Sequence, residues 1–156
     1  MHGFDVNTVH VLLQTAVACS LLMSVDVEEA IFPTDPNCPE PGSEWCNSGL
    51  YLVVLPGPGA YDIGLPIDCP CLAVFPPYKY LLSFRFEAAN APVDLITDNF
   101  PSPCTSWNNW GLGWKDLVVE YGFPGNLSFY ADADCCEPTI PVEGKTWGAI
   151  KQLYKQ

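Results

Sequence analysis

The most distinctive stretch of the chain is CTSWNNWGLGW, residues 104–114, which combines tryptophans, asparagines and glycines. Flat indole rings stack on the apolar faces of sugars, and side-chain amides form hydrogen bonds with hydroxyl groups. The stretch therefore predicts a platform that binds carbohydrate, with the alternative that the indoles cover a hydrophobic core. The candidate platform residues are Trp107, Asn108, Asn109, Trp110 and Trp114.

Carboxylates are the other groups that could do chemistry. Two positioned carboxyl groups are enough for a glycoside hydrolase, and the chain has 18 Asp plus Glu. A solvated acidic surface explains the same composition, and we expect no enzymatic activity. The carboxylates available for a catalytic pair are Asp62, Asp68, Glu87, Asp94, Asp98, Asp116, Glu120, Asp132 and Asp134.

Two positions suggest a calcium ion and a glycan. Asp132 and Asp134 are separated by one residue, so on a strand both side chains point to the same side. They are candidates for a structural calcium site, which needs further oxygen ligands, or else they mark a solvated strand end. We expect no other cofactor. Asn126 starts an Asn-Leu-Ser sequon at an expected turn and is a candidate glycosylation site.

Histidine-dependent and nucleotide-binding chemistry are expected to be absent. The only histidines are His2 and His10, and both lie in the N-terminal segment described below. The remaining chain therefore has no Ser-His-Asp or Cys-His nucleophile and no histidine-ligated metal. The sequence also has no P-loop, GxGxxG, GxSxG or HExxH motif.

The charge balance argues against a nucleic-acid partner. Lysine and arginine total 6 against 18 acidic residues. Three of the six lie in the last 12 residues, whereas a phosphate backbone needs several positive charges on one face. The acidity is instead what keeps a protein soluble.

Eight cysteines in 156 residues favour disulfides and hence an oxidising compartment. An all-cysteine zinc site is the alternative, although the sequence has no CxxC pair. Disulfides are expected to involve Cys38, Cys46, Cys69, Cys71, Cys104, Cys135 and Cys136. The suggested pairs are Cys38 with Cys46, and Cys104 with Cys135 or Cys136.

The N-terminal segment allows two interpretations. Residues 9–23 are an apolar run about as long as a signal-peptide core, and an A-x-A sequence lies directly before Cys19. No lysine or arginine precedes the run, which departs from the usual positive start. Residues 1–30 are expected to be either a cleaved leader or a retained strand or helix donated to a neighbour. Cleavage that removes Cys19 would leave seven cysteines, an odd number.

Strands dominate the expected structure because 16 prolines and 12 glycines interrupt the chain. Residues 78–87 alternate apolar and polar side chains, the pattern of an antiparallel sheet with one buried face. Residues 115–121 and 127–133 are expected to pair as a hairpin across a Pro-Gly turn. Further strands are expected at residues 50–55, 71–75 and 93–97.

These elements predict an all-β fold: an antiparallel β-sandwich, jelly-roll or immunoglobulin-like in layout, stapled by disulfides. The sandwich domain is expected over residues 31–145. Residues 146–156 are expected to add a short C-terminal helix, because Thr146 can cap its start.

The stretch from Cys104 to Cys136 resembles a segment of uncharacterised secreted, cysteine-rich β-sandwich proteins of uncultivated bacteria. The tail TWGAIKQLYK resembles the C-terminal ending of the same proteins. The resemblance implies bacterial export and a cysteine-stapled β domain. Those proteins carry no established function, so the resemblance implies no catalytic residue.

Three functions fit these observations. The first is a non-catalytic structural or surface module, including a subunit of a self-assembling fibre, whose partners are its own copies or other surface proteins. The second is a carbohydrate-binding module that uses the tryptophans. The third is a carboxylate-dependent glycoside hydrolase. All three place the protein outside the cell or on its surface.

Overall fold

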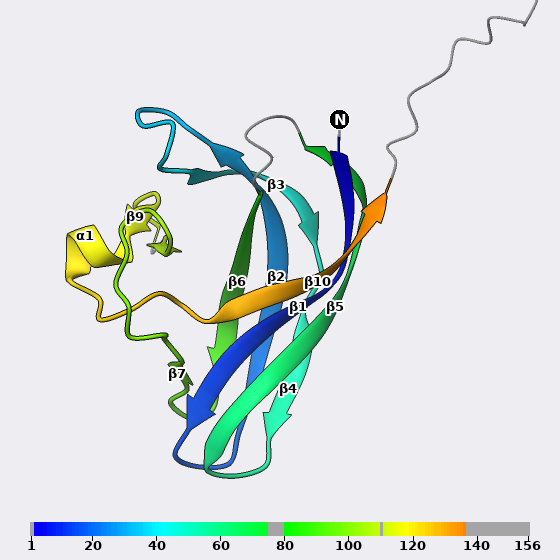
Figure 1. Cartoon of the computed structure of the whole chain (residues 1–156). Helices are drawn as coiled ribbons and strands as arrows, with labels where there is room; N and C mark the ends of the chain where they lie inside the picture. The colour runs from blue at the N-terminus through cyan, green and yellow to red at the C-terminus, as the bar shows by residue number, and fades with distance from the viewer. Residues whose placement is uncertain (1, 75–79, 110, 137–156) are drawn as a thin grey trace, which may run out of the picture.

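The computed structural model describes residues 2–74, 80–109 and 111–136, and the structural statements below concern those ranges. Two antiparallel sheets pack face to face, and a short third pair lies beside them (Figure 1). The strands are β1 (His2–Thr15), β2 (Cys19–Ile31), β3 (Glu40–Asn47), β4 (Tyr51–Leu55), β5 (Gly59–Val74), β6 (Tyr80–Ala89), β7 (Asp94–Leu95), β8 (Trp107–Asn108), β9 (Lys115–Asp116) and β10 (Phe129–Cys136). One helix among the described residues, α1 (Leu117–Tyr121), follows β9 directly.

Each sheet is built around one long N-terminal strand. In the first sheet β1 pairs with β5 along one edge, and with β10 and then β7 along the other. In the second sheet β2 pairs with β4 and β3 on one side and with β6 on the other. The connection between β1 and β2 is three residues long, so the chain passes directly from the centre of one sheet to the centre of the other.

The core lies between the two sheets and follows the period-2 alternation of their strands. The fully covered side chains of β1 and β2 face each other, and β4 and β5 complete the cluster. The core residues are Val6, Val9, Val11, Leu13, Cys19, Leu21, Met23, Val25, Val27, Val53, Leu55, Leu65, Ile67 and Cys69. The predicted antiparallel, disulfide-stapled β-sandwich is therefore confirmed.

The fold does not divide at the boundary expected at residue 31. Residues 2–31 supply nine of the fourteen core side chains, because β1 and β2 are the central strands of the two sheets. The segment is a packing element of its own sandwich, so it is neither separate from the domain nor donated to a neighbour in this structure. The predicted C-terminal helix at 146–156 lies outside the described residues.

Both suggested cysteine pairings are also wrong. In the described chain the disulfides join Cys38 to Cys104, Cys46 to Cys69, and Cys71 to Cys136. Each of them links segments far apart in the sequence, and the Cys46–Cys69 bond joins β3 of one sheet to β5 of the other. Cys135, expected in a disulfide, has a free exposed thiol, and Cys19 has a free buried thiol.

The hairpin predicted for residues 115–133 does not form. Asp116 caps α1, since its Oδ1 accepts hydrogen bonds from the amides of Val118 at 2.8 Å and Val119 at 3.0 Å. Gly122 ends the helix with φ 62°, a left-handed conformation that glycine adopts without steric cost. These two caps outweigh the β-propensity of the valines between them. The strand β10 pairs with β1 instead.

Candidate functional site

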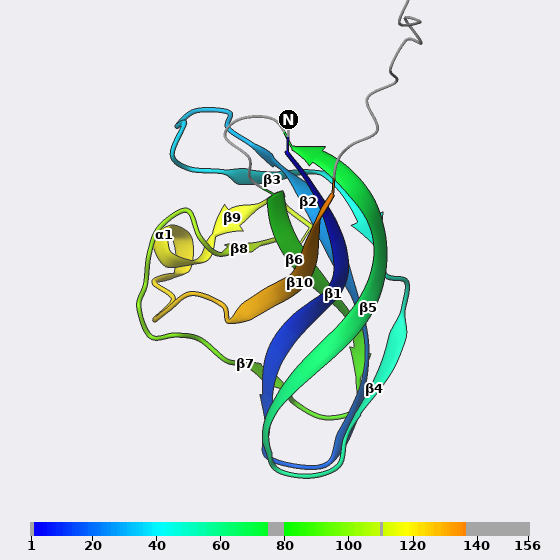
Figure 2. The same cartoon turned by 45° about the vertical axis from the view of Figure 1, so that its right-hand side comes forward.

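A pocket of about 920 Å³ lies between the edge strand β6 and the segment that follows β7. We call residues 97–109 and 111–127 the covering segment; they carry β8, β9 and α1 and lie beside β6 in both views (Figures 1 and 2). Ligand pockets for small molecules typically measure about 300–1,000 Å³. The pocket is therefore large enough to hold an organic ligand.

Two buried carboxylates of β2 form part of the pocket wall. Asp26 is 1% exposed and Glu28 is 6% exposed, and both line the pocket. They occupy the positions of β2 that alternate with the core residues Val25 and Val27, so they lie on the outer face of the second sheet. Carboxylates are rarely this buried unless other polar groups compensate them.

Those compensating groups come from the neighbouring strands. The Asn47 amide donates to Asp26, and the Ser83 hydroxyl donates to Glu28 Oε1 at 2.6 Å and lies 3.3 Å from Asp26 Oδ2. The Arg85 guanidinium lies 3.7 Å from Asp26 and 3.8 Å from Glu44. Register explains the arrangement, because Ser83 and Arg85 of β6 are paired with Asp26 and Ser24 of β2.

Burial dominates the acidity of both carboxyl groups. It raises the pKa of Asp26, as does the charge of Glu44, while Arg85, Ser83 and Asn47 act in the opposite direction. The pKa of Glu28 is raised mainly by burial, and also by the negative charges of Asp26 and Glu44. These are groups whose protonation a ligand could change.

The opposite wall of the pocket contains most of the predicted sugar platform. Trp107, Asn108, Asn109 and Trp114 all line the pocket. Trp110 is outside the described residues. Within the described chain, the buried side-chain polar atoms without a hydrogen-bond partner are Trp107 Nε1 and Asn108 Oδ1. An unpaired donor and an unpaired acceptor therefore belong to successive residues of β8, whose side chains point to opposite sides of the strand.

The covering segment is held in place by Asp116 and a disulfide. Trp107 pairs with Asp116, and Asn108 with Lys115, in the β8–β9 ladder. Besides capping α1, Asp116 accepts a hydrogen bond from the backbone N–H of Cys104. Cys104 is bonded in turn to Cys38, which precedes β3. The position of Trp107 is therefore fixed by its pairing with β9 and by the nearby disulfide of Cys104.

The acidic pair was missed by the sequence analysis, because residues 1–30 were set aside as a leader. The signal was present: in VDVEE, residues 25–29, valines alternate with acidic residues as on a strand with one buried face. Since Ser83 Oγ contacts both carboxylates, Asp26 Oδ2 and Glu28 Oε1 lie no more than about 6 Å apart, so two carboxyl groups share one pocket wall, as a glycosidase requires. The hydrolase alternative therefore has its acidic pair.

A second cluster of ionisable groups lies on the outer face of the first sheet. His10 Nδ1 is 2.9 Å from Asp62 Oδ1, and His10 Nε2 is 3.3 Å from Asp132 Oδ2. Tyr130 stacks on the imidazole ring and donates to Asp62 Oδ2 at 2.6 Å. The fold therefore contains a histidine, because β1 places His10 on the outer face of the first sheet.

This cluster predicts a pH dependence of stability. The hydrogen bond to Asp62 is the main cause that raises the pKa of His10 above its ordinary 6.5, with a smaller contribution from Asp132. A raised folded-state pKa stabilises the fold below the unfolded pKa, and the contribution is lost as pH rises through the folded pKa. We expect His10→Gln to be less stable than the native chain at about pH 6 and to approach it at about pH 9. Urea unfolding at both pH values measures this, and an unchanged difference would contradict it.

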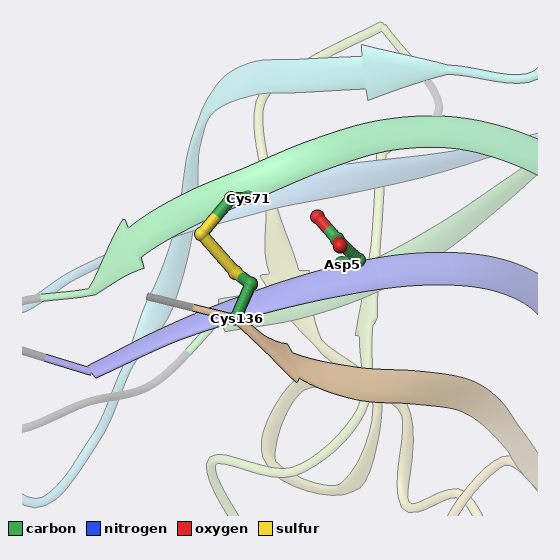
Figure 3. A group of neighbouring side chains, drawn as sticks. All are labelled: Asp5, Cys71 and Cys136. Carbon is green, nitrogen blue, oxygen red and sulfur yellow. A yellow bond between two sulfur atoms is a disulfide. The ribbon is translucent and has the colours of Figure 1, made fainter. Parts of the chain in front are cut away.

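The calcium candidates are occupied by other contacts. Asp132 faces His10, and Asp134 accepts a hydrogen bond from Asn7 Nδ2 at 3.0 Å. In the described chain the group of potential metal ligands close enough to share an ion is Asp5, Cys71 and Cys136. These two cysteines form a disulfide and offer no thiolate (Figure 3). Asp132 and Asp134 do not belong to that group.

The sequon asparagine has a structural role. Asn126 Nδ2 donates to Asp98 at 3.0 Å and to the Phe100 carbonyl at 2.8 Å. Its Oδ1 accepts from the backbone N–H of Ser102 at 3.2 Å and from the Thr105 hydroxyl. Asn126 therefore holds together the base of the covering segment, and attaching a glycan to Nδ2 would replace one of its two hydrogens and remove at least one of the bonds that it donates.

Comparisons with known proteins define the family of the chain. No described helix is long and apolar enough to span a membrane. No curated protein and no solved structure matches the chain. One family model does match, over residues 1–133, and this range includes β1 and β2 as well as the pocket. The chain therefore belongs to the family described as Domain of unknown function (DUF7451).

Proposed function

We propose that the protein binds carbohydrate in the pocket between β6 and the covering segment, and that it works outside the cytoplasm. The observation that carries the proposal is the pocket wall formed by Trp107, Asn108, Asn109 and Trp114, which combines flat aromatic rings with side-chain amides. A sugar presents apolar faces that stack on indole rings, and its hydroxyl groups both donate to and accept from side-chain amides. The disulfides of the described chain support an oxidising compartment.

The remaining lining fits the same ligand class. Trp107 and Trp114 offer flat apolar surface, while Asn109, Ser83 and Arg85 offer polar groups around it. A pocket that is mostly apolar and aromatic, with a few placed polar groups, is typical of small-molecule sites. Sugars present apolar faces and polar edges, and this lining has counterparts for both.

Binding explains the acidic pair better than hydrolysis does. A catalytic carboxylate must reach the glycosidic bond, yet the Asp26 side chain is 2% exposed. Its oxygens face Asn47, Ser83 and Arg85, which leaves little access for a sugar. The pair is therefore placed to support the pocket wall and its electrostatics.

The tryptophan wall gives a direct test. We expect Trp114→Ala to lower the affinity for the glycan that the native protein binds by about tenfold or more, because stacking surface is lost. The matched control is Leu112→Ala, since Leu112 lies in the same segment, is 89% exposed and does not line the pocket. A glycan array identifies the ligand, and isothermal titration calorimetry measures each variant. No binding by the native protein, or equal binding by both variants, would contradict the proposal.

A structural role remains the second candidate. Residues 2–31 pack within their own sandwich, which removes one support for a fibre built by strand donation. The observation in its favour is β4, whose outward residues Leu52 and Val54 are 70% and 64% exposed. In the described chain β4 pairs only with β2, so it is an edge strand with apolar side chains. Electron microscopy of the native protein would show fibres if this role is correct.

A further inference from the structure

The charges around the pocket are unbalanced. Arg85 is the basic residue among the described lining residues, and its guanidinium is shared between Asp26 and Glu44. Glu28 has no ion pair in the described chain and accepts one hydrogen bond, from the Ser83 hydroxyl. When the carboxyl groups of Asp26, Glu28 and Glu44 are all ionised, the single positive charge of Arg85 faces three negative charges. The unbalanced charge lies at Glu28, in the pocket wall.

We propose that the pocket selects amino sugars, with the protonated amine of the ligand placed against Glu28. This inference rests on the proposed carbohydrate binding and specifies its ligand class. An ammonium group supplies the positive charge that the wall lacks, and at a partly buried site such a pair interacts more strongly than in water. A neutral sugar leaves Glu28 with its single hydrogen bond.

The aromatic lining favours the same group. Trp107, Trp114, Tyr80 and Tyr121 all line the pocket. A cation within reach of an indole or phenol face is attracted by the negative face of the ring, most strongly for tryptophan.

The sugar ring distinguishes this ligand from other cations. A basic peptide side chain would also meet Glu28 and the aromatic rings. However, the amide side chains of Asn108 and Asn109 also line the pocket, and hydroxyl groups bond to amides as both donors and acceptors, which a lysine ammonium cannot do. The flat indoles likewise match a ring better than a flexible alkyl chain. The combination of donor, acceptor and carboxylate in one pocket favours a polyol that carries an amine.

The test compares two oligosaccharides that differ only at the amine. Isothermal titration calorimetry at about pH 6, where a sugar amine is protonated, measures the full oxidised chain with a glucosamine tetramer and an N-acetylglucosamine tetramer. We expect the native protein to prefer the free-amine tetramer by about tenfold. Glu28→Gln keeps an acceptor for Ser83 but removes the charge, so it should lose this preference and still bind the acetylated tetramer. Thermal unfolding checks that the variant is folded.

The control variant is Glu87→Gln. It makes the same charge change on β6 at an exposed position that does not line the pocket, and it should keep the native preference. An equal loss in both variants would show a general charge effect and overturn the inference. So would equal native affinity for the two tetramers, or binding of tetralysine at least as tight as that of the glucosamine tetramer. The preference of the native protein is measured without any variant, so it tests the amino-sugar inference directly. If the native protein binds neither tetramer and no glycan on the array, the proposal of carbohydrate binding itself is overturned.

Discussion

Replacing Val25 by aspartate is expected to leave the chain unable to fold. Val25 is 0% exposed and lies in the middle of β2, paired with Phe84 of β6 on one edge and hydrogen-bonded to Ser48, between β3 and β4, on the other. A carboxylate there has no cation to pair with in the described core. An uncompensated buried charge costs several kcal/mol, and the whole stability of a domain is about 5–15 kcal/mol.

The matched control lies in the same N-terminal segment. Val17 is 50% exposed in the connection between β1 and β2, so Val17→Asp should fold like the native chain. Far-ultraviolet circular dichroism and thermal unfolding of the oxidised proteins measure both variants. If residues 1–30 were a leader absent from the folded protein, the purified products would have equal stability. That outcome would contradict the central position of β2.

The fold class was predictable because local patterns determine it. The alternation in residues 78–87 indicated β6, and the apolar run at 50–55 indicated β4. The same rule applied to residues 19–27 would have indicated β2, whose core side chains alternate from Cys19 to Val27. Leu22 is apolar at a position where the alternation expects a polar residue. The segment therefore resembled the continuous apolar run of a signal peptide.

The long-range features were not predictable from one sequence. Cysteine spacing does not determine connectivity, because Cys38 reaches Cys104 only through the folded covering segment. The site combines Glu28 with Trp107 from strands that lie far apart in the chain and are brought together by tertiary packing. Local composition identified the tryptophan wall, whereas the acidic wall needed the pairing of β2 with β6.

The second large effect is expected at Gly3, where a disulfide passes over a strand. The bond between Cys71 and Cys136 links β5 to β10, and β1 runs between them (Figure 3). A Cβ atom at Gly3 would lie 2.7 Å from Cys71 Sγ and 2.8 Å from Cys136 Sγ, closer than nonbonded contacts allow. Both sulfurs are fixed by their bond, so they cannot rotate away as a free side chain would. Glycine is thus the residue that lets the disulfide and the strand coexist.

Gly3→Val should therefore prevent this disulfide or displace the end of β1. Loss of a native disulfide costs about 2–5 kcal/mol. Thiol labelling of the denatured protein, read by mass spectrometry, should find Cys71 and Cys136 labelled in addition to the free thiols of Cys19 and Cys135. Gly57→Val is the control, because a Cβ there meets no atom within 4 Å. If Gly3→Val showed the same labelled cysteines and the same thermal stability as the native protein, the disulfide could not pass over β1 at Gly3. A valine side chain would then fit where the two sulfurs lie.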